Sequence, residues 1–197
     1  MFVGDLTEIL LMSVTLRVTF DEYAQMVEDG AFDALRDRRI ELFQGELREM
    51  NPPGPDHSEA VSRLNRWSVL TPPANQVNVR VQDPIGIPEL DSAPQPDIAW
   101  TVPRSYADRH PLPHEVYLLI EVADSSVADD CGEKAALYAT AGIQDYWVVN
   151  LPERLVHVFR GPTGGAYQQQ FIARVGDETA PLKFPDVRLS VADLLAL

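Results

Sequence analysis

Two carboxylates and one lysine are placed where they could do chemistry together. Glu121 interrupts the apolar run 116–122, a pattern typical of a strand that is covered on both faces. An ionised carboxylate buried in such a strand costs several kcal/mol unless a cation or hydrogen bonds compensate it. The sequence therefore predicts a partner for Glu121, unless this residue lies at an exposed end of the strand.

Asp97 is the second carboxylate. It begins a predicted strand in which Ile98 and Trp100 share one face, so Asp97 lies on the other face. If this strand neighbours the strand of Glu121, the two carboxylates converge. Their repulsion then predicts either a raised pKa or a hard cation such as Mg²⁺ between them. The alternative for Asp97 is a turn residue after a proline.

Lys134 is the third candidate, because the chain contains fourteen arginines and only two lysines. A simple positive charge in this chain is therefore normally an arginine. Lysine is a compact charge on a flexible stem, and from a helix that follows the Glu121 strand it can reach a water or a phosphate oxygen. The alternative is a solvated helix residue that pairs with Asp130 at i,i+4.

Glu46 and His57 carry weaker signals. Glu46 opens a predicted strand and offers another carboxylate, but Glu41 and Glu49 are equally acidic neighbours. His57 stands near the start of a helix, after a loop of proline and glycine, where histidine is more often a cap or surface residue than a ligand. The sequence contains no Walker loop, no G-x-G-x-x-G and no G-x-S-x-G, which argues against nucleotide-binding and α/β-hydrolase chemistry.

Periodicity and turn signals predict the elements that must position these residues. We expect helices at 20–28, 56–70, 130–141 and from Ser190, a hairpin of strands 39–43 and 46–50, and strands at 77–82, 97–102, 116–123, 146–150, 155–160 and 168–174. In the helix at 130–141, Asp130 is the expected N-cap and Gly142 the stop. This order predicts a mixed α/β (α+β) fold around one central sheet.

Composition limits the function classes. A chain of 197 residues with a net charge of −14 has room for one domain, which we place at 19–197 after an extension at 1–18. The acidic balance argues against non-specific coating of DNA. No apolar run is long enough for a membrane span, and Asp5 and Glu8 do not suit a signal peptide. A single cysteine, Cys131, agrees with a cytoplasmic location.

Taken together, these residues resemble the PD-(D/E)XK nuclease pattern and, more narrowly, the Uma2 family (DUF820) of restriction endonuclease-like proteins. The resemblance covers about residues 19–195. It is carried by stretches 41–47, 96–99, 119–126, 130–134 and 138–149, together with His57.

The resemblance implies a restriction endonuclease-like core, with a central mixed sheet flanked by helices, and a divalent cation, Mg²⁺ or Mn²⁺. Asp97 and Glu121 would be the metal carboxylates, with the backbone carbonyl of Val122 as a further ligand. Glu46 would be an added acid near the site. The lysine that usually follows the Glu by two residues is replaced by alanine, and Lys134 stands in for it from the next helix.

The implied activity is metal-assisted hydrolysis of phosphodiester bonds in nucleic acid, with DNA favoured over RNA. A homodimer is also expected, because such folds commonly pair and the region 146–160 has edge-strand character. Segment 127–133 contains no basic residue, so phosphate contacts fall to other cations. The candidates are Arg36, Arg38, Arg39, Arg63 and Arg66. Two alternatives are an inactive nuclease-fold module that binds a protein partner or metal, and a hydrolase of smaller phosphate esters.

Overall fold

A six-stranded mixed sheet forms the centre of the protein in a computed structural model that describes residues 16–35 and 38–196. The strand order is β3-β4-β5-β6-β7-β8, and the pairs are antiparallel except for parallel β5–β6. The strands are β3 (Asn78–Val81), β4 (Ile98–Thr101), β5 (Val116–Ala123), β6 (Asp145–Asn150), β7 (Leu155–Thr163) and β8 (Ala166–Arg174). The predicted fold class, with one mixed sheet packed against helices, is confirmed.

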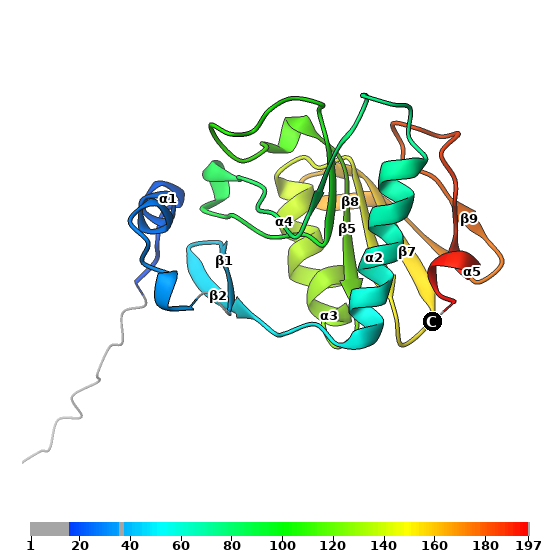
Figure 1. The fold of residues 1–197 in the computed structure, drawn as a ribbon, viewed down its shortest axis with the longest axis horizontal. Coiled ribbons are helices and arrows are strands. Elements are labelled where there is room, and N and C mark those ends of the chain that lie inside the picture. Colours follow the sequence, from blue (N-terminus) through cyan, green and yellow to red (C-terminus); the bar gives the residue numbers. More distant parts are fainter. Residues whose placement is uncertain (1–15, 36–37, 197) are drawn as a thin grey trace, which may run out of the picture.

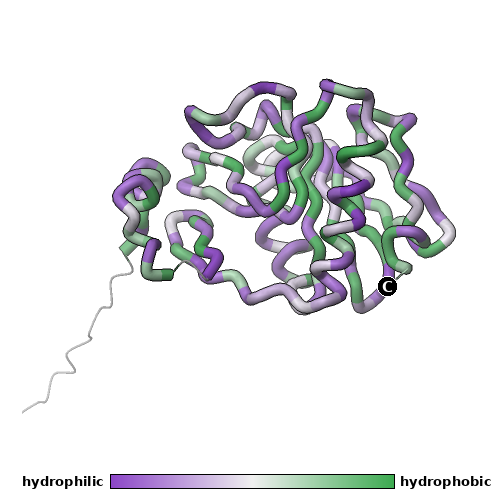
Figure 2. The backbone as a smooth tube through the Cα atoms, in the orientation of Figure 1, coloured by the Kyte–Doolittle hydropathy of each residue, from purple (hydrophilic) through white to green (hydrophobic). Residues whose placement is uncertain are grey.

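Helices cover both faces of this sheet (Figure 1). Helix α2 (Pro55–Leu70) contacts β3, β4, β5 and the short α5 (Val191–Leu194) on one face, where Trp100 and Trp147 are fully buried. Helix α4 (Ala135–Thr140) packs on the other face with Leu119 and Tyr146. Apolar residues line the central strands in Figure 2, because both faces are covered. As predicted, Ile98 and Trp100 share one of these faces.

The hairpin of β1 (Arg39–Phe43) and β2 (Glu46–Met50) forms a separate small sheet beside the main body (Figure 1). Its turn places Gln44 and Gly45 at φ +49° and +79°, which favours a glycine in the second position. Helix α1 (Phe20–Glu28) has Thr19 as its N-cap, and Thr19 and Glu22 form a capping box. The hairpin is joined to the segment after β3 by the Ala93 N–H, which donates to the Leu42 carbonyl at 2.8 Å.

Short elements connect these units. They are η1 (Asp33–Leu35), η2 (Pro88–Leu90), η3 (Pro113–Glu115), β9 (Glu178–Thr179) and β10 (Leu189–Ser190). Of the extension expected at 1–18, residues 1–15 lie outside the described part of the chain, and Val18 N–H donates to the Gly45 carbonyl at 2.9 Å. The domain boundary at 19 stays a prediction. Among the described residues, no helix is both long and apolar enough to cross a membrane.

The helix expected at 130–141 begins earlier and is irregular. It opens as α3 (Val127–Asp129), continues as the π-helical turn η4 (Asp130–Lys134) and ends as α4. The prediction that Asp130 is its N-cap is wrong, since the Asp130 N–H already donates to the Ser126 carbonyl inside the helix. Its side chain turns inward instead, and accepts a 2.5 Å hydrogen bond from Ser126 Oγ. The predicted stop is confirmed, with Gly142 at φ +82°.

The edge strands of the sheet are not where the sequence suggested. Region 146–160 comprises β6 and most of β7, and both are interior strands. The described edges are β3 and β8. The prediction failed because β8 looked weak in sequence, yet it pairs with β7 from residue 163 to residue 155. The homodimer stays a prediction without that argument.

Candidate active site

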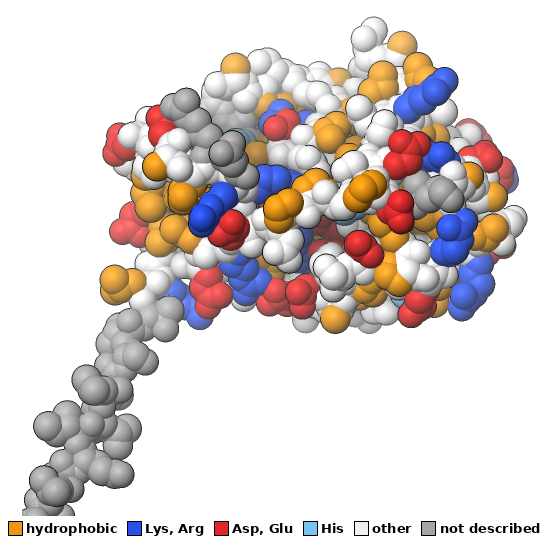
Figure 3. Space-filling model, turned by 60° about the horizontal axis from the view of Figure 1, so that its bottom comes forward, with side chains coloured by type: hydrophobic (Ala, Val, Ile, Leu, Met, Phe, Trp, Pro, Cys, Tyr) orange, Lys and Arg blue, Asp and Glu red, His pale blue; other side chains and the backbone are white. Residues whose placement is uncertain are grey.

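A pocket opens at the end of the sheet where β5 finishes. In Figure 1 this end of β5 lies beside α3. The pocket walls come from the hairpin, the start of α2, the residue before β4, the end of β5, and η4. Figure 3 views the molecule from this end and shows acidic side chains spread over it. Charged residues dominate the lining: Arg39, Glu41, Arg48, Glu49, Asp97, Glu121, Asp124, Asp129, Asp130, Glu133 and Lys134.

Glu121 is buried at the floor of this pocket, with 2% of its surface exposed. It lies on the central strand β5, with β4 and β6 on either side, which excludes the alternative of an exposed strand end. Burial raises the pKa of Glu121 to about 8, against the lowering effect of Lys134, and the neighbouring carboxylates Asp130, Asp97 and Glu41 raise it further. The surroundings of Glu121 therefore compensate its charged form only partly.

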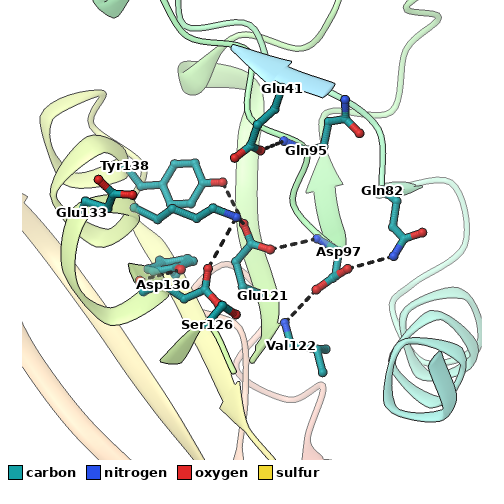
Figure 4. A network of polar contacts seen from close by, with 12 residues as sticks. Glu41, Gln82, Gln95, Asp97, Glu121, Val122, Ser126, Asp130, Glu133 and Tyr138 are labelled. Carbon is teal, nitrogen blue, oxygen red and sulfur yellow. Dashed lines mark hydrogen bonds and ion pairs between the residues drawn. The ribbon is translucent and has the colours of Figure 1, made fainter. Parts of the chain in front are cut away.

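Asp97 stands next to Glu121 because β4 and β5 are antiparallel neighbours, with Ile98 opposite Ile120. The Asp97 N–H donates to Glu121 Oε2 at 3.4 Å (Figure 4). Asp97 lies in a bend directly before β4 and is only 4% exposed, so it is a buried residue at the start of the strand. The predicted convergence of the two carboxylates is thus present in the structure.

The Asp97 carboxylate is held by three donors. Oδ2 accepts from Val122 N–H at 2.9 Å and lies 3.2 Å from His57 Nε2, while Oδ1 accepts from Gln82 Nε2 at 3.0 Å. Burial alone would raise the pKa of Asp97, but these hydrogen bonds outweigh it and lower the pKa. The two neighbouring acids are therefore unlike: hydrogen bonds lower the pKa of Asp97, whereas burial raises the pKa of Glu121.

Lys134 reaches the same point from η4. Its Nζ lies 3.1 Å from Glu121 Oε1 and 3.5 Å from Asp130 Oδ1. Burial would lower the pKa of Lys134, but Glu121, Glu41 and Asp130 together hold it above its ordinary value. The i,i+4 pairing with Asp130 exists, yet Lys134 is 9% exposed and so is not the solvated residue of the alternative interpretation.

Two buried residues of the network were missed in the sequence. Tyr138 on α4 donates its hydroxyl to Glu121 Oε1 at 3.0 Å, and it is fully buried. Glu41 on β1 is 4% exposed, and its Oε2 accepts from Gln95 N–H at 3.2 Å. Both appear with the cluster in Figure 4. The available signals were the inward face of β1 for Glu41 and the i,i+4 spacing from Lys134 for Tyr138.

The structure does not bring Glu46 to the pocket. Glu46 lies beside the hairpin turn, its side chain is 45% exposed, and it pairs with Arg48 at 3.3 Å. It shares a hairpin face with Glu41, but Glu41 lies farther from the turn and lines the pocket, whereas Glu46 does not. Glu41, and not the expected Glu46, is therefore the hairpin carboxylate nearer to Asp97 and Glu121 that lines the pocket.

His57 is at the site, bonded to Asp97 from the first turn of α2. Its Nδ1 is buried and has no hydrogen-bond partner among the described residues. Of the arginines expected to contact phosphate, Arg39 lines the pocket, Arg38 pairs with Glu49, and Arg63 pairs with Glu59. Arg36 lies outside the described residues.

The floor of the pocket is rich in carboxylates, the ligand type that hard divalent cations prefer. Four carboxylates, Glu41, Asp97, Glu121 and Asp130, are buried here, and the ammonium group of Lys134 contacts two of them, Glu121 and Asp130. Within residues 16–35 and 38–196, no group of three or more His, Cys, Asp or Glu side chains is arranged to hold a metal ion. Mg²⁺ is usually held by only one or two carboxylates, with water and substrate completing its shell. The Asp97–Glu121 pair offers two carboxylates, the number of protein ligands that Mg²⁺ usually takes, and not a closed cage.

Comparisons with known proteins identify a family and a similar fold. The Uma2 family, described as "Putative restriction endonuclease", matches residues 20–192. A crystal structure of "a putative nuclease belonging to DUF820" from Anabaena variabilis superposes with a TM-score of 0.70 at 17% sequence identity, over 91% of this chain and 98% of that chain. At that identity the likeness shows the fold alone. No curated protein matches the chain.

Proposed function

Since the chain belongs to the Uma2 family, we propose that it is a metal-dependent endonuclease that hydrolyses phosphodiester bonds in nucleic acid. The observation that carries the proposal is the buried meeting of Asp97, Glu121 and Lys134 at the floor of an open pocket. Two adjacent carboxylates and a lysine are the groups that phosphodiester hydrolysis with a divalent cation needs.

Asp97 and Glu121 would hold the cation, Mg²⁺ or Mn²⁺, with the backbone carbonyl of Val122 as a further ligand. When bound, the cation would polarise the phosphate and lower the pKa of a coordinated water. Asp97 enters this role ionised, because His57, Gln82 and the Val122 N–H all donate to it.

Lys134 would orient the attacking water and stabilise the charge that develops on the phosphate oxygens. Its position depends on Glu121, which it shares with the Tyr138 hydroxyl. Glu41 adds negative charge on the opposite side of the ammonium group and helps to keep it protonated. These neighbours would make Lys134 a fixed cation and not a general base.

Nucleic acid, with DNA favoured over RNA, is the proposed substrate, and the cytoplasm is the proposed location. A second candidate is a nuclease-fold module that binds a partner without cleavage. The acidic lining favours it, because eight carboxylates face three basic side chains in the pocket. A phosphodiester that approaches these carboxylates is repelled unless cations are present. Added metal should therefore enable cleavage if the protein is a nuclease, and should produce no cleavage if it is a binding module.

Cleavage assays distinguish them. The wild-type protein should cut plasmid and linear DNA with Mg²⁺ or Mn²⁺ and not with EDTA. Asp97→Asn and Glu121→Gln should each lower the rate at least about a hundredfold, the usual effect of losing an electrostatic group at the reacting centre. Glu49→Gln, which removes a carboxylate from the pocket edge, is the matched control and should retain activity. Equal activity in all four proteins would refute the site assignment.

A further inference from the structure

Arg48 has a position that the proposed chemistry does not yet use. The hairpin register sets Arg48 opposite Glu41, so both residues lie on the face that lines the pocket. Its guanidinium carbon lies 4.0 Å from the centroid of the Phe43 ring. Stacking on an aromatic ring fixes the plane of a guanidinium and leaves its N–H groups free to bond sideways.

Those N–H groups are taken by carboxylates. Nη1 of Arg48 donates to Oε1 of Glu133, and Nη2 lies 3.3 Å from Oε2 of the same residue. Nη2 also donates to Glu46 at 3.3 Å. The pair with Glu133 joins the hairpin to η4, the turn that carries Lys134. A bidentate carboxylate on arginine occupies the same donors that a phosphate would take.

The other cations of the pocket are less available. Lys134 is buried against Glu121 and Asp130, and Arg39 donates to the side chain and carbonyl of Gln95. The side chain of Arg48 is 33% exposed, so a ligand in the pocket can reach it. Arg48 is therefore the accessible arginine of the pocket, and its guanidinium group already binds the Glu133 carboxylate.

We propose that Arg48 binds a phosphate of the substrate and that Glu133 is a built-in competitor for the same guanidinium. The proposal rests on the proposed nuclease function, because it names a substrate contact of that site. A phosphate entering the pocket displaces Glu133 from Arg48, and the 45% exposed Glu133 side chain turns to solvent. Because Glu133 must be displaced first, the exchange weakens the binding of nucleic acid. Binding also breaks the contact that joins the hairpin to η4.

The exchange has a measurable salt signature. A lysine or arginine that neutralises a phosphate releases a counterion, which contributes about −0.7 to the slope of log K against log salt for single strands. Arg48 paired with Glu133 has its charge already compensated, so it releases little counterion on binding. Removing Glu133 leaves Arg48 with only the 3.3 Å contact to Glu46 and should therefore add up to this contribution. Removing Arg48 as well should cancel it.

The test measures binding of a fluorescein-labelled, mixed-sequence single-stranded oligonucleotide by anisotropy, with Ca²⁺ in place of Mg²⁺, over a range of NaCl. Glu133→Gln should tighten binding about tenfold, the value of one charge-assisted contact, and steepen the salt slope by about 0.7. The double variant Glu133→Gln/Arg48→Gln should lose both gains. Asp129→Asn, which removes the same charge from the same wall without removing a partner of Arg48, is the matched control.

Equal gains in Glu133→Gln and Asp129→Asn would overturn the inference, because the effect would then be general repulsion. A gain that survives in the double variant would overturn it as well. If the wild-type protein cuts DNA but Glu133→Gln binds no better than Asp129→Asn, the proposal that Glu133 competes with phosphate is wrong, and the nuclease proposal is retained. If neither the wild type nor Glu133→Gln binds or cuts, the nuclease proposal fails with it.

Discussion

At the scale of single residues, the site is a problem of charge compensation. Glu121 and Asp97 are adjacent acids with opposite pKa shifts, since Asp97 accepts from three donors while burial dominates at Glu121. Lys134 is the cation that makes the burial of Glu121 tolerable. Removing one member of such a group leaves an uncompensated charge, which costs more than the contact itself.

Lys134→Met should therefore destabilise the protein by about 3 kcal/mol, because Glu121, Glu41 and Asp130 lose their shared cation. Glu121→Gln should cost less, since Lys134 keeps Asp130. The double variant Glu121→Gln/Lys134→Met should be clearly more stable than the sum of the single losses predicts. Urea denaturation of the four proteins checks this, and strictly additive losses would contradict it.

Three of the residues that meet at this point could be predicted from the sequence. Glu121 stood out in an apolar strand, Asp97 opposed Ile98 and Trp100, and Lys134 was rare by composition. Glu41 and Tyr138 could not be assigned in the same way, because a tertiary contact decides them. Glu41 differs from Glu46 only in its distance from the turn, and the burial that results from packing is not written in the local pattern.

At the scale of elements, the irregular helix positions the side chain of Lys134. Its π-turn, η4, places Asp130 and Lys134 on the buried side. π-turns inside helices are rare and frequently occur at functional sites. The sequence predicted a helix here but not the turn, since an i→i+5 pattern has no propensity signal. The strands and the hairpin were predictable because alternation and the Gln44-Gly45 turn determine them locally.

A second feature at this scale is the ion pair between Glu115 and Arg109, which holds the loop before β5. Glu115 accepts from Arg109 Nη1 at 2.6 Å and Nη2 at 2.8 Å, and from Leu112 N–H at 2.9 Å. The hydrogen bonds from Arg109 act first among the causes that lower the pKa of Glu115 to about 2, against the effect of burial. The carboxylate thus stays ionised in the folded protein at a pH where it is protonated in the unfolded chain.

This difference sets the sign of a pH effect. A depressed folded-state pKa gives stability that is present above the ordinary value of 4.5 and is lost as pH falls toward 2. Wild-type protein should therefore lose unfolding free energy across that window, and Glu115→Gln should lose less of it. Glu178→Gln, an exposed partner of exposed Arg188, serves as the control and should follow the wild type. Parallel acid limbs for wild type and Glu115→Gln would contradict the assignment.

At the scale of the whole molecule, a net charge of −14 surrounds a pocket that is itself acidic. This negative electrostatic potential repels nucleic acid and attracts divalent cations. The overall fold class followed from element order, because helices and strands in that order are typical of a mixed sheet packed against helices. That β4 and β5 are neighbours was only a condition of the sequence argument, and the structure supplies it. The location of the sheet edge did not follow, since β8 is defined by its partner β7 and not by its own apolar pattern.

The central claim is that Asp97 and Glu121 form a cation site. The thermal midpoint of the wild-type protein, measured in EDTA, in Mg²⁺ and in Mn²⁺ beside Asp97→Asn, tests it most directly, because an ion that binds only the folded state raises the midpoint. Mn²⁺ should raise the midpoint of the wild type and leave that of Asp97→Asn unchanged. An equal rise in both proteins, or no rise in either, would contradict the claim.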